Sequence, residues 1–113
     1  MTVNERTSGP TTILDLSGNI TIGESADILR DKIRSLLQQG QRQLVVNLAG
    51  VSYMDSAGLG ELVRAHATAT QQGAALKLTN VTKRLQDLLV ITKLSTVFDS
   101  YDDEAAAIAS FGS

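Results

Sequence analysis

The chain has 113 residues, a net charge of −2, 42% hydrophobic and 4% aromatic residues, and no cysteine. The lack of cysteine excludes disulfides and thiolate chemistry, and the lack of a basic run or of stacking aromatics argues against nucleic-acid binding. No apolar stretch reaches the roughly 18 residues of a membrane span, and the polar N-terminus lacks a signal-peptide core, so we expect a single cytoplasmic domain.

The first 20 residues predict two strands joined by a turn. Residues 2–8 alternate weakly between polar and apolar, as in a short edge strand. Gly9 and Pro10 form a turn signal, and residues 11–18 are rich in β-branched and aliphatic side chains. We expect these two segments to pair as a hairpin.

Residues 21–40 have the pattern of an amphipathic helix. Five apolar side chains recur at helical spacing: Ala26, Leu29, Ile33, Leu36 and Leu37. Thr21 and Glu24 fit a capping box at the start of this helix, and Ser25 is a rival cap. Gly40 is placed to end the helix in a left-handed turn.

The rest of the chain alternates between strands and helices. Residues 43–50 form a nearly continuous apolar run, which is typical of a strand that is central in a parallel sheet. The later predicted elements are a helix from Ser56 to Gly73, a strand at 75–80, a helix at 81–94 capped by Asn80, a strand at 96–101 and a helix at 102–111 that begins with three acids. Strands that alternate with helices imply right-handed parallel crossovers.

The predicted fold is therefore a single α/β domain over residues 1–113. Its sheet has four to five mostly parallel strands with an N-terminal antiparallel hairpin, and it carries about four helices.

No set of residues suited to catalysis is evident. The only histidine, His66, lies ten residues after Ser56 on the same predicted helix. That spacing separates them by about 15 Å, whereas a general base must lie within about 3 Å of its proton. We expect His66 to lie at the edge of the buried face. With one histidine and no cysteine, only carboxylates could hold a metal, and the acids at 102–104 suit a solvated helix start, so we expect no enzyme activity, cofactor or metal.

The start of the second helix has an unusual composition. Asp55 and Ser56 stand side by side where one cap would suffice. Gly58 and Gly60 follow, although glycine in a helix costs up to about 1 kcal/mol relative to alanine. One interpretation is structural, with Asp55 and Ser56 as caps and Gly58 as a packing residue. The other is functional: glycines let another surface approach, and bare N–H groups favour an anion, which makes Ser56 a credible phosphoacceptor.

The stretch "LVVNLAGVSYMDSAGLGELV" resembles the signature of the STAS domain family, specifically of bacterial anti-sigma factor antagonists. The matching features are an apolar strand that ends in Asn47 and the run Asp-Ser-x-Gly-Leu-Gly at residues 55–60, which opens a helix. The resemblance extends over nearly the whole chain. It implies that the unphosphorylated protein binds an anti-sigma factor that is also a serine kinase, and thereby frees a sigma factor. Phosphorylation of Ser56 would end this binding, and a PP2C-type phosphatase would restore it; ATP would belong to the partner.

The resemblance also implies a partner-binding surface. Its residues are Asp55, Ser56, Ala57, Gly58, Leu59, Gly60 and Thr21. Many relatives carry aspartate where this chain has Thr21, so the identity of the kinase is left open. The alternatives are a scaffold subunit of a stress-sensing assembly, an accessory subunit of a lipid or anion transport system, and a small hydrolase that uses Ser56. We expect a monomer or weak homodimer without nucleic-acid or membrane partners.

Overall fold

A five-stranded sheet with the order β1-β2-β3-β4-β5 forms the centre of the structure, a computed structural model that describes residues 1–111. The elements in chain order are β1 (Thr2–Ser8), β2 (Thr11–Ile20), α1 (Glu24–Gln38), β3 (Gln43–Met54), α2 (Ser56–Gln71), β4 (Ala75–Thr79), α3 (Lys83–Ile91), β5 (Asp99–Tyr101) and α4 (Glu104–Phe111). β1 and β2 pair antiparallel, and all other pairings are parallel. The predicted hairpin and the mostly parallel sheet are confirmed.

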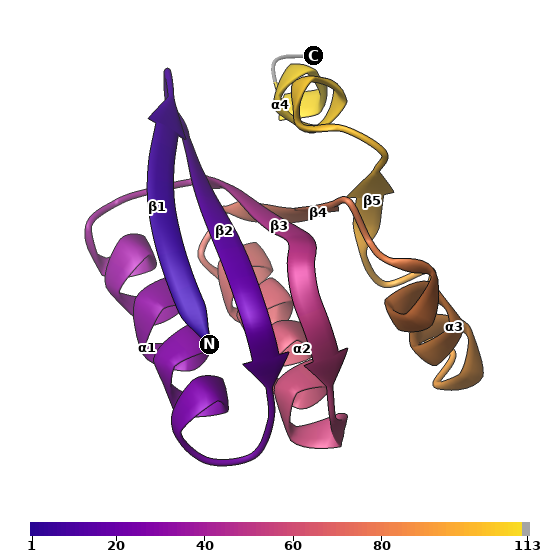
Figure 1. Ribbon diagram of the computed structural model, residues 1–113. Coiled ribbons are helices and arrows are strands. Elements are labelled where there is room, and N and C mark those ends of the chain that lie inside the picture. Colours follow the sequence, from indigo (N-terminus) through magenta and orange to yellow (C-terminus); the bar gives the residue numbers. More distant parts are fainter. Residues whose placement is uncertain (112–113) are drawn as a thin grey trace.

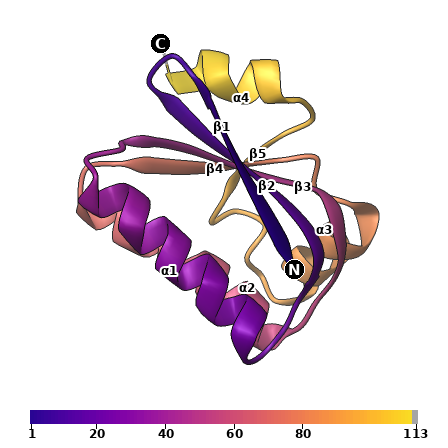
Figure 2. The same cartoon turned by 60° about the vertical axis from the view of Figure 1, so that its left-hand side comes forward.

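The helices cover the two faces of the sheet unequally. Helices α1 and α2 lie side by side on one face, and α4 lies on the other (Figures 1 and 2). The large core lies on the first face and also includes Leu85 and Leu89 of α3. A small second cluster joins Ile13 and Val45 to Ala107 of α4. The central strand β3 is therefore buried on both faces, which explains its continuous apolar run.

Strand β3 is longer than predicted because it contains two irregularities. Its pairing with β2 shifts register between Asp15 and Ser17, and again between Gly18 and Asn19. Each shift leaves one extra residue on β3, as in a β-bulge. Gly50, which ended the predicted strand, lies in the first shift, where an added Cβ would come within 2.9 Å of the Ser17 Cβ. The strand therefore continues past Gly50 to the residues that precede α2.

The ends of α1 are determined by glycines. Gly40 has φ +89°, so the predicted left-handed end is confirmed. The predicted capping box is wrong: the N-cap is Gly23, with φ +102° and no side-chain cap in the described chain. The Ser25 hydroxyl instead reaches back to Thr21, whose N–H donates to it at 2.8 Å. Because the glycine turn precedes the helix, Thr21 lies two residues too early to cap it.

Helix α3 is shorter than the predicted 81–94. Its N-cap is Thr82, whose hydroxyl accepts from the Leu85 N–H at 3.3 Å, so the prediction of Asn80 as cap is wrong. Asn80 has φ +55° and extends the turn after β4. The helix ends because Lys93 adopts φ +62°. Each helix of residues 1–111 is too short or too polar to cross a bilayer.

The last elements differ from the prediction mainly at their starts. The strand predicted at 96–101 begins only at Asp99, because the Val97 N–H donates to the Leu94 carbonyl in a turn. Phe98 is buried in the main core rather than placed in a strand. Helix α4 begins at Glu104, and the Asp103 carboxylate accepts from the N–H of Ala106 at 2.7 Å.

Candidate functional site

Asp55 joins two segments at the carboxyl end of the sheet. Its Oδ1 accepts from the backbone N–H of Gly58 at 2.9 Å, which caps α2. Its Oδ2 accepts from the backbone N–H of Ile22 at 2.9 Å, in the loop between β2 and α1. These two N–H groups, Gly58 first, lower the pKa of the Asp55 carboxyl. Asp55 is therefore ionised, and its carboxylate connects the N-terminus of α2 to the loop between β2 and α1.

Ser56 is the first residue of α2, and its side chain is exposed. The N–H that a serine cap would bind, at Gly58, already donates to Asp55. Within the described part of the chain, the Ser56 hydroxyl has no hydrogen bond shorter than 3.5 Å. The two neighbouring polar side chains thus have separate roles: Asp55 caps the helix, and Ser56 presents a hydroxyl to solvent.

The two glycines of this helix also differ from each other. Gly58 is buried, and an added Cβ would overlap the carbonyl oxygen of Ile20 and come within 2.9 Å of its carbonyl carbon. Gly58 is therefore a packing glycine that lets α2 approach β2. A Cβ on Gly60 would meet nothing within 4 Å among the described residues. Of these two glycines, Gly60 is therefore the one with free space beside its Cα, where another surface could approach the backbone.

The predicted partner-binding residues fall into three groups by exposure. Gly58 and Leu59 are buried in the protein itself. Ser56 is exposed. The remaining predicted residues are half-buried: Thr21, Asp55, Ala57 and Gly60. The exposed part of the prediction is therefore a small surface around Ser56, bordered by the loop between β2 and α1.

Ser56 also lines a groove that sequence reasoning missed. The groove has a volume of about 460 Å³ and lies between the start of α2 and helix α3. Tyr53 and Ser56 line one wall, and Arg84, Leu88 and Ile91 line the other. Ile91 is 77% exposed and Tyr53 47% exposed, although both are large apolar side chains. The sequence contained one sign of this exposed apolar surface: Ile91 does not follow the helical spacing of Leu85 and Leu89, the buried residues of α3.

Asn47, part of the matched signature, lies away from this surface. Its Nδ2 donates to Asp15 of β2 at 2.9 Å, and its Oδ1 accepts from the Asn80 side chain at 3.0 Å. The Oδ1 also accepts from the Ala49 N–H at 3.1 Å, where the first β3 irregularity begins. Asn47 therefore links β2, β3 and the turn after β4, and its role is structural.

The only histidine of the chain lies too far from Ser56 to act as its general base. Helix α2 is continuous from Ser56 to Gln71, so His66 lies about 15 Å along it from Ser56. His66 is half-buried and packs edge-on against Phe98, with ring centroids 5.3 Å apart. Residues 1–111 contain no group of three histidine, aspartate or glutamate side chains that could hold a metal ion.

Comparisons with known proteins agree on one family. The family model described as STAS domain matches residues 2–107. The anti-sigma-B factor antagonist of Bacillus subtilis (strain 168) is 41% identical over 86 residues, which cover 76% of this chain and 77% of that protein.

Two solved structures show the same fold. A structure from Thermotoga maritima has a TM-score of 0.88 at 20% identity and covers 96% of this chain and 92% of that chain. The Bacillus cell fate determinant SpoIIAA in its phosphorylated form has a TM-score of 0.72 at 19% identity and covers 93% of this chain and 96% of that chain. At these identities the two structures are evidence of fold alone.

Proposed function

The chain belongs to the STAS domain family, and we propose that it is an anti-sigma factor antagonist controlled by phosphorylation of Ser56. In its unphosphorylated form it binds an anti-sigma factor that is also a serine kinase, and a sigma factor is released. The kinase transfers the γ-phosphoryl group of ATP to the Ser56 hydroxyl oxygen, which loses its proton, and ADP is the leaving group. The modified protein leaves the kinase, and a PP2C-type phosphatase hydrolyses the phosphate. The protein works as a monomer or weak homodimer in the cytoplasm.

The exposed and unused hydroxyl of Ser56 is the observation that carries this proposal. A serine that capped α2 would have to break its cap to react, which would couple phosphorylation to loss of structure. Asp55 performs the capping instead, so Ser56 is free to be modified while the helix stays intact. The fold similarity to the phosphorylated form of SpoIIAA supports a modification that leaves the domain folded.

The charge around Ser56 explains how a phosphate would switch binding off. Phosphorylation adds a charge of about −1.5 to −2 at neutral pH. Asp55, ionised and adjacent, already contributes a negative charge to the surface that the partner would cover. Repulsion and desolvation together would weaken binding by a few kcal/mol, and about 4 kcal/mol corresponds to a thousandfold change in Kd.

The proposed partner surface combines the exposed and half-buried residues around Ser56. It includes Thr21 and Ala57, the open backbone at Gly60, and Ile22, which is 79% exposed. The Asp55 carboxylate holds Ile22 in place by accepting a hydrogen bond from the Ile22 backbone N–H. An apolar side chain presented this way suits a protein partner better than a small polar ligand. The antagonist role is favoured over a scaffold or transport subunit because the 41% identical relative is named an anti-sigma-B factor antagonist.

A capture experiment with three baits tests this function. Wild-type protein and Ser56→Ala should retain the same kinase from a bacterial lysate, identified by mass spectrometry, and Ser56→Asp should not. Incubation with that kinase and ATP should add about 80 Da to the wild-type protein and nothing to Ser56→Ala.

Ser35→Asp is the matched control, because it adds the same charge at an exposed position near the C-terminal end of α1. It should bind the kinase like the wild type. If Ser56→Asp binds the kinase as well as Ser35→Asp does, or if the adduct forms on another residue, the proposed switch is wrong.

A further inference from the structure

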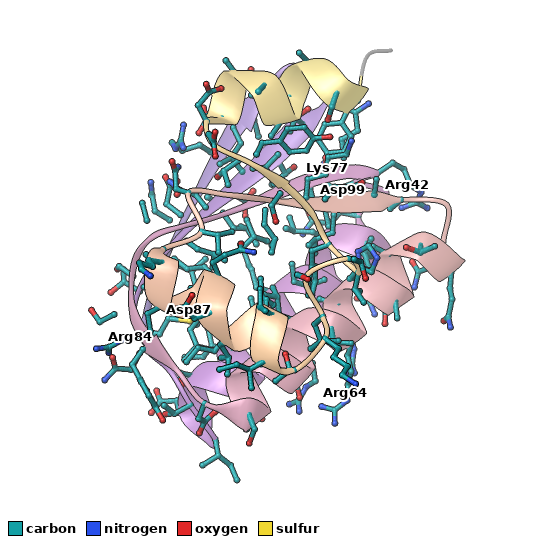
Figure 3. The ribbon with its side chains drawn as sticks, turned by 90° about the vertical axis from the view of Figure 1, so that its right-hand side faces the viewer. Arg42, Arg64, Lys77, Arg84, Asp87 and Asp99 are labelled. Carbon is teal, nitrogen blue, oxygen red and sulfur yellow. The ribbon has the colours of Figure 1, made fainter. Side chains whose placement is uncertain are left out.

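The groove beside Ser56 contains a cation that the proposed function does not use. Arg84 lies in the first turn of α3 and lines the same 460 Å³ groove as Ser56, from the opposite wall. Figure 3 shows Arg84 and Asp87 projecting from α3 at one side of the molecule, with Arg64 at the other side. Arg84 of α3 and Ser56 of α2 therefore line the same groove.

Arg84 is available for a new partner. Among residues 1–111 it has no carboxylate within 4 Å, and its one hydrogen bond, from Nη1 to the Ser52 carbonyl, is long at 3.4 Å. The nearby Asp87 does not compensate it, since the closest cation to that carboxylate is Lys83 at 3.9 Å. Most of the five N–H donors of Arg84 are therefore unused in the described structure.

Two backbone N–H groups near Ser56 are already bonded and would not be free for a phosphate. The N–H of Gly58, in the first turn of α2, donates to the Asp55 carboxylate. The N–H of Ile22 donates to the same carboxylate. The Asp55 carboxylate would also repel the phosphate. A phosphate dianion binds a guanidinium group through two parallel hydrogen bonds, and Arg84 is the one cationic side chain among the described residues that line the groove.

From this arrangement we propose that Arg84 binds the phosphate of phosphorylated Ser56 across the groove, and that this ion pair covers the apolar wall formed by Leu88 and Ile91. The inference rests on the proposed phosphorylation of Ser56 and adds a second element to the switch. Phosphorylation then both adds repulsive charge and closes a surface that is apolar and open in the unmodified protein. The charged groups that line the groove are Asp55 beside Ser56, and Arg84 and Asp87 on α3.

The test uses protein with phosphoserine incorporated at position 56 during translation, so that no kinase is required. The second pKa of the phosphate is measured by phosphorus NMR titration. Because Arg84 favours the dianion, Arg84→Ala should raise this pKa by about 0.3 to 0.7 units, and Arg84→Lys should give a smaller increase. Arg64→Ala is the matched control, since Arg64 is equally cationic, 71% exposed and paired with Glu61 away from the groove. It should leave the phosphate pKa unchanged.

A second readout addresses the apolar wall. Backbone amides of Leu88 and Ile91 should shift between the unmodified and phosphoserine proteins, and the shift should be lost in Arg84→Ala. An unchanged phosphate pKa in both Arg84 variants, with spectra that show folded protein, would overturn the proposal. If instead no kinase modifies Ser56, the proposed function fails while the phosphate of the translated phosphoserine still reports on Arg84, so the two failures are distinguishable.

Discussion

The Asp55 carboxylate accepts a hydrogen bond from the backbone N–H of Ile22, a residue 33 positions earlier in the chain, at 2.9 Å. Through the same carboxylate, α2 is capped at Gly58. A single side chain thus sets both the helix start and the position of the neighbouring loop. Because Asp55 makes these bonds, Ser56 is not needed to cap α2, and the loop beside Ser56 is held in one position.

Substitution of the two neighbouring residues should have opposite consequences. Asp55→Ala removes two hydrogen bonds that no other described side chain replaces, so we expect a clear fall in melting temperature. Ser56→Ala removes an unbonded hydroxyl and should change the free energy of unfolding by less than about 0.5 kcal/mol. Chemical denaturation of both variants measures this difference. Equal destabilisation by the two changes would mean that Ser56 shares the capping role.

The two glycines of α2 should also respond differently. Gly58→Ala forces a methyl group against the Ile20 carbonyl and should destabilise the fold by about 1 to 3 kcal/mol. Gly60→Ala meets open space and lowers the entropy of the unfolded chain, so it should stabilise the fold by about 0.4 to 1 kcal/mol. Denaturation midpoints of the two variants give the comparison, with the wild type as reference. A stabilised Gly58→Ala would contradict the tight approach of α2 to β2.

Stability should fall at low pH, in part because of Asp15. Its pKa is lowered from 3.8 to about 2, first by the hydrogen bond from Arg6 at 2.6 Å. The unfolded chain therefore takes up this proton before the folded protein does as the pH falls. The stabilisation is complete above about pH 4 and is lost between about pH 4 and pH 2. The lowered pKa of Asp55 acts in the same direction.

Asp15→Asn and Arg6→Ala should each flatten this pH dependence. Because Arg6 also pairs with Glu104, Arg6→Ala removes the larger set of contacts, and Asp15→Asn should add little to it. Thermal unfolding from pH 6 to pH 2 provides the measurement. Near neutral pH the loss should stay within about 1 kcal/mol, because the pair is partly exposed to solvent. Two effects that simply add would show that Asp15 and Arg6 act on stability independently.

Asn47 should matter for stability and not for partner binding. Asn47→Ala removes one donor bond and two acceptor bonds that join β2, β3 and the turn at Asn80. We expect a loss of about 1 to 3 kcal/mol, with kinase capture at a given folded concentration unchanged. Loss of capture in a fully folded variant would place Asn47 in the partner surface after all.

Local sequence patterns were sufficient for the element order and for several helix ends. The helical spacing of Leu29 and Ile33 predicted the buried face of α1, and Gly40 and Gly73, with φ +89° and +76°, end their helices as expected. The sequence also placed Ser56 at the first turn of α2. These features depend on residues within a few positions of one another, where spacing and backbone preference are informative.

Cap residues and strand ends were less predictable. Asn80 and Thr82 are both good cap residues, and the choice between them depends on the turn after β4, where Asn80 bonds to Asn47. Gly50 resembles a strand end in the sequence, but it is the residue that lets β3 pass close to Ser17. In each case the same residue type suits two local structures, and a distant contact selects one of them.

By itself the sequence determined the α/β architecture, the parallel pairing of the later strands and the position of Ser56, because periodicity and turn chemistry are local properties. Only the tertiary structure decided that Asp55 rather than Ser56 is the cap, that Gly58 serves packing while Gly60 stays open, and that Arg84 and Ser56 line the same groove. The physical reason is that each of these roles depends on a group supplied by another part of the chain. Ile22, Ile20 and helix α3 reach this corner only when the sheet assembles.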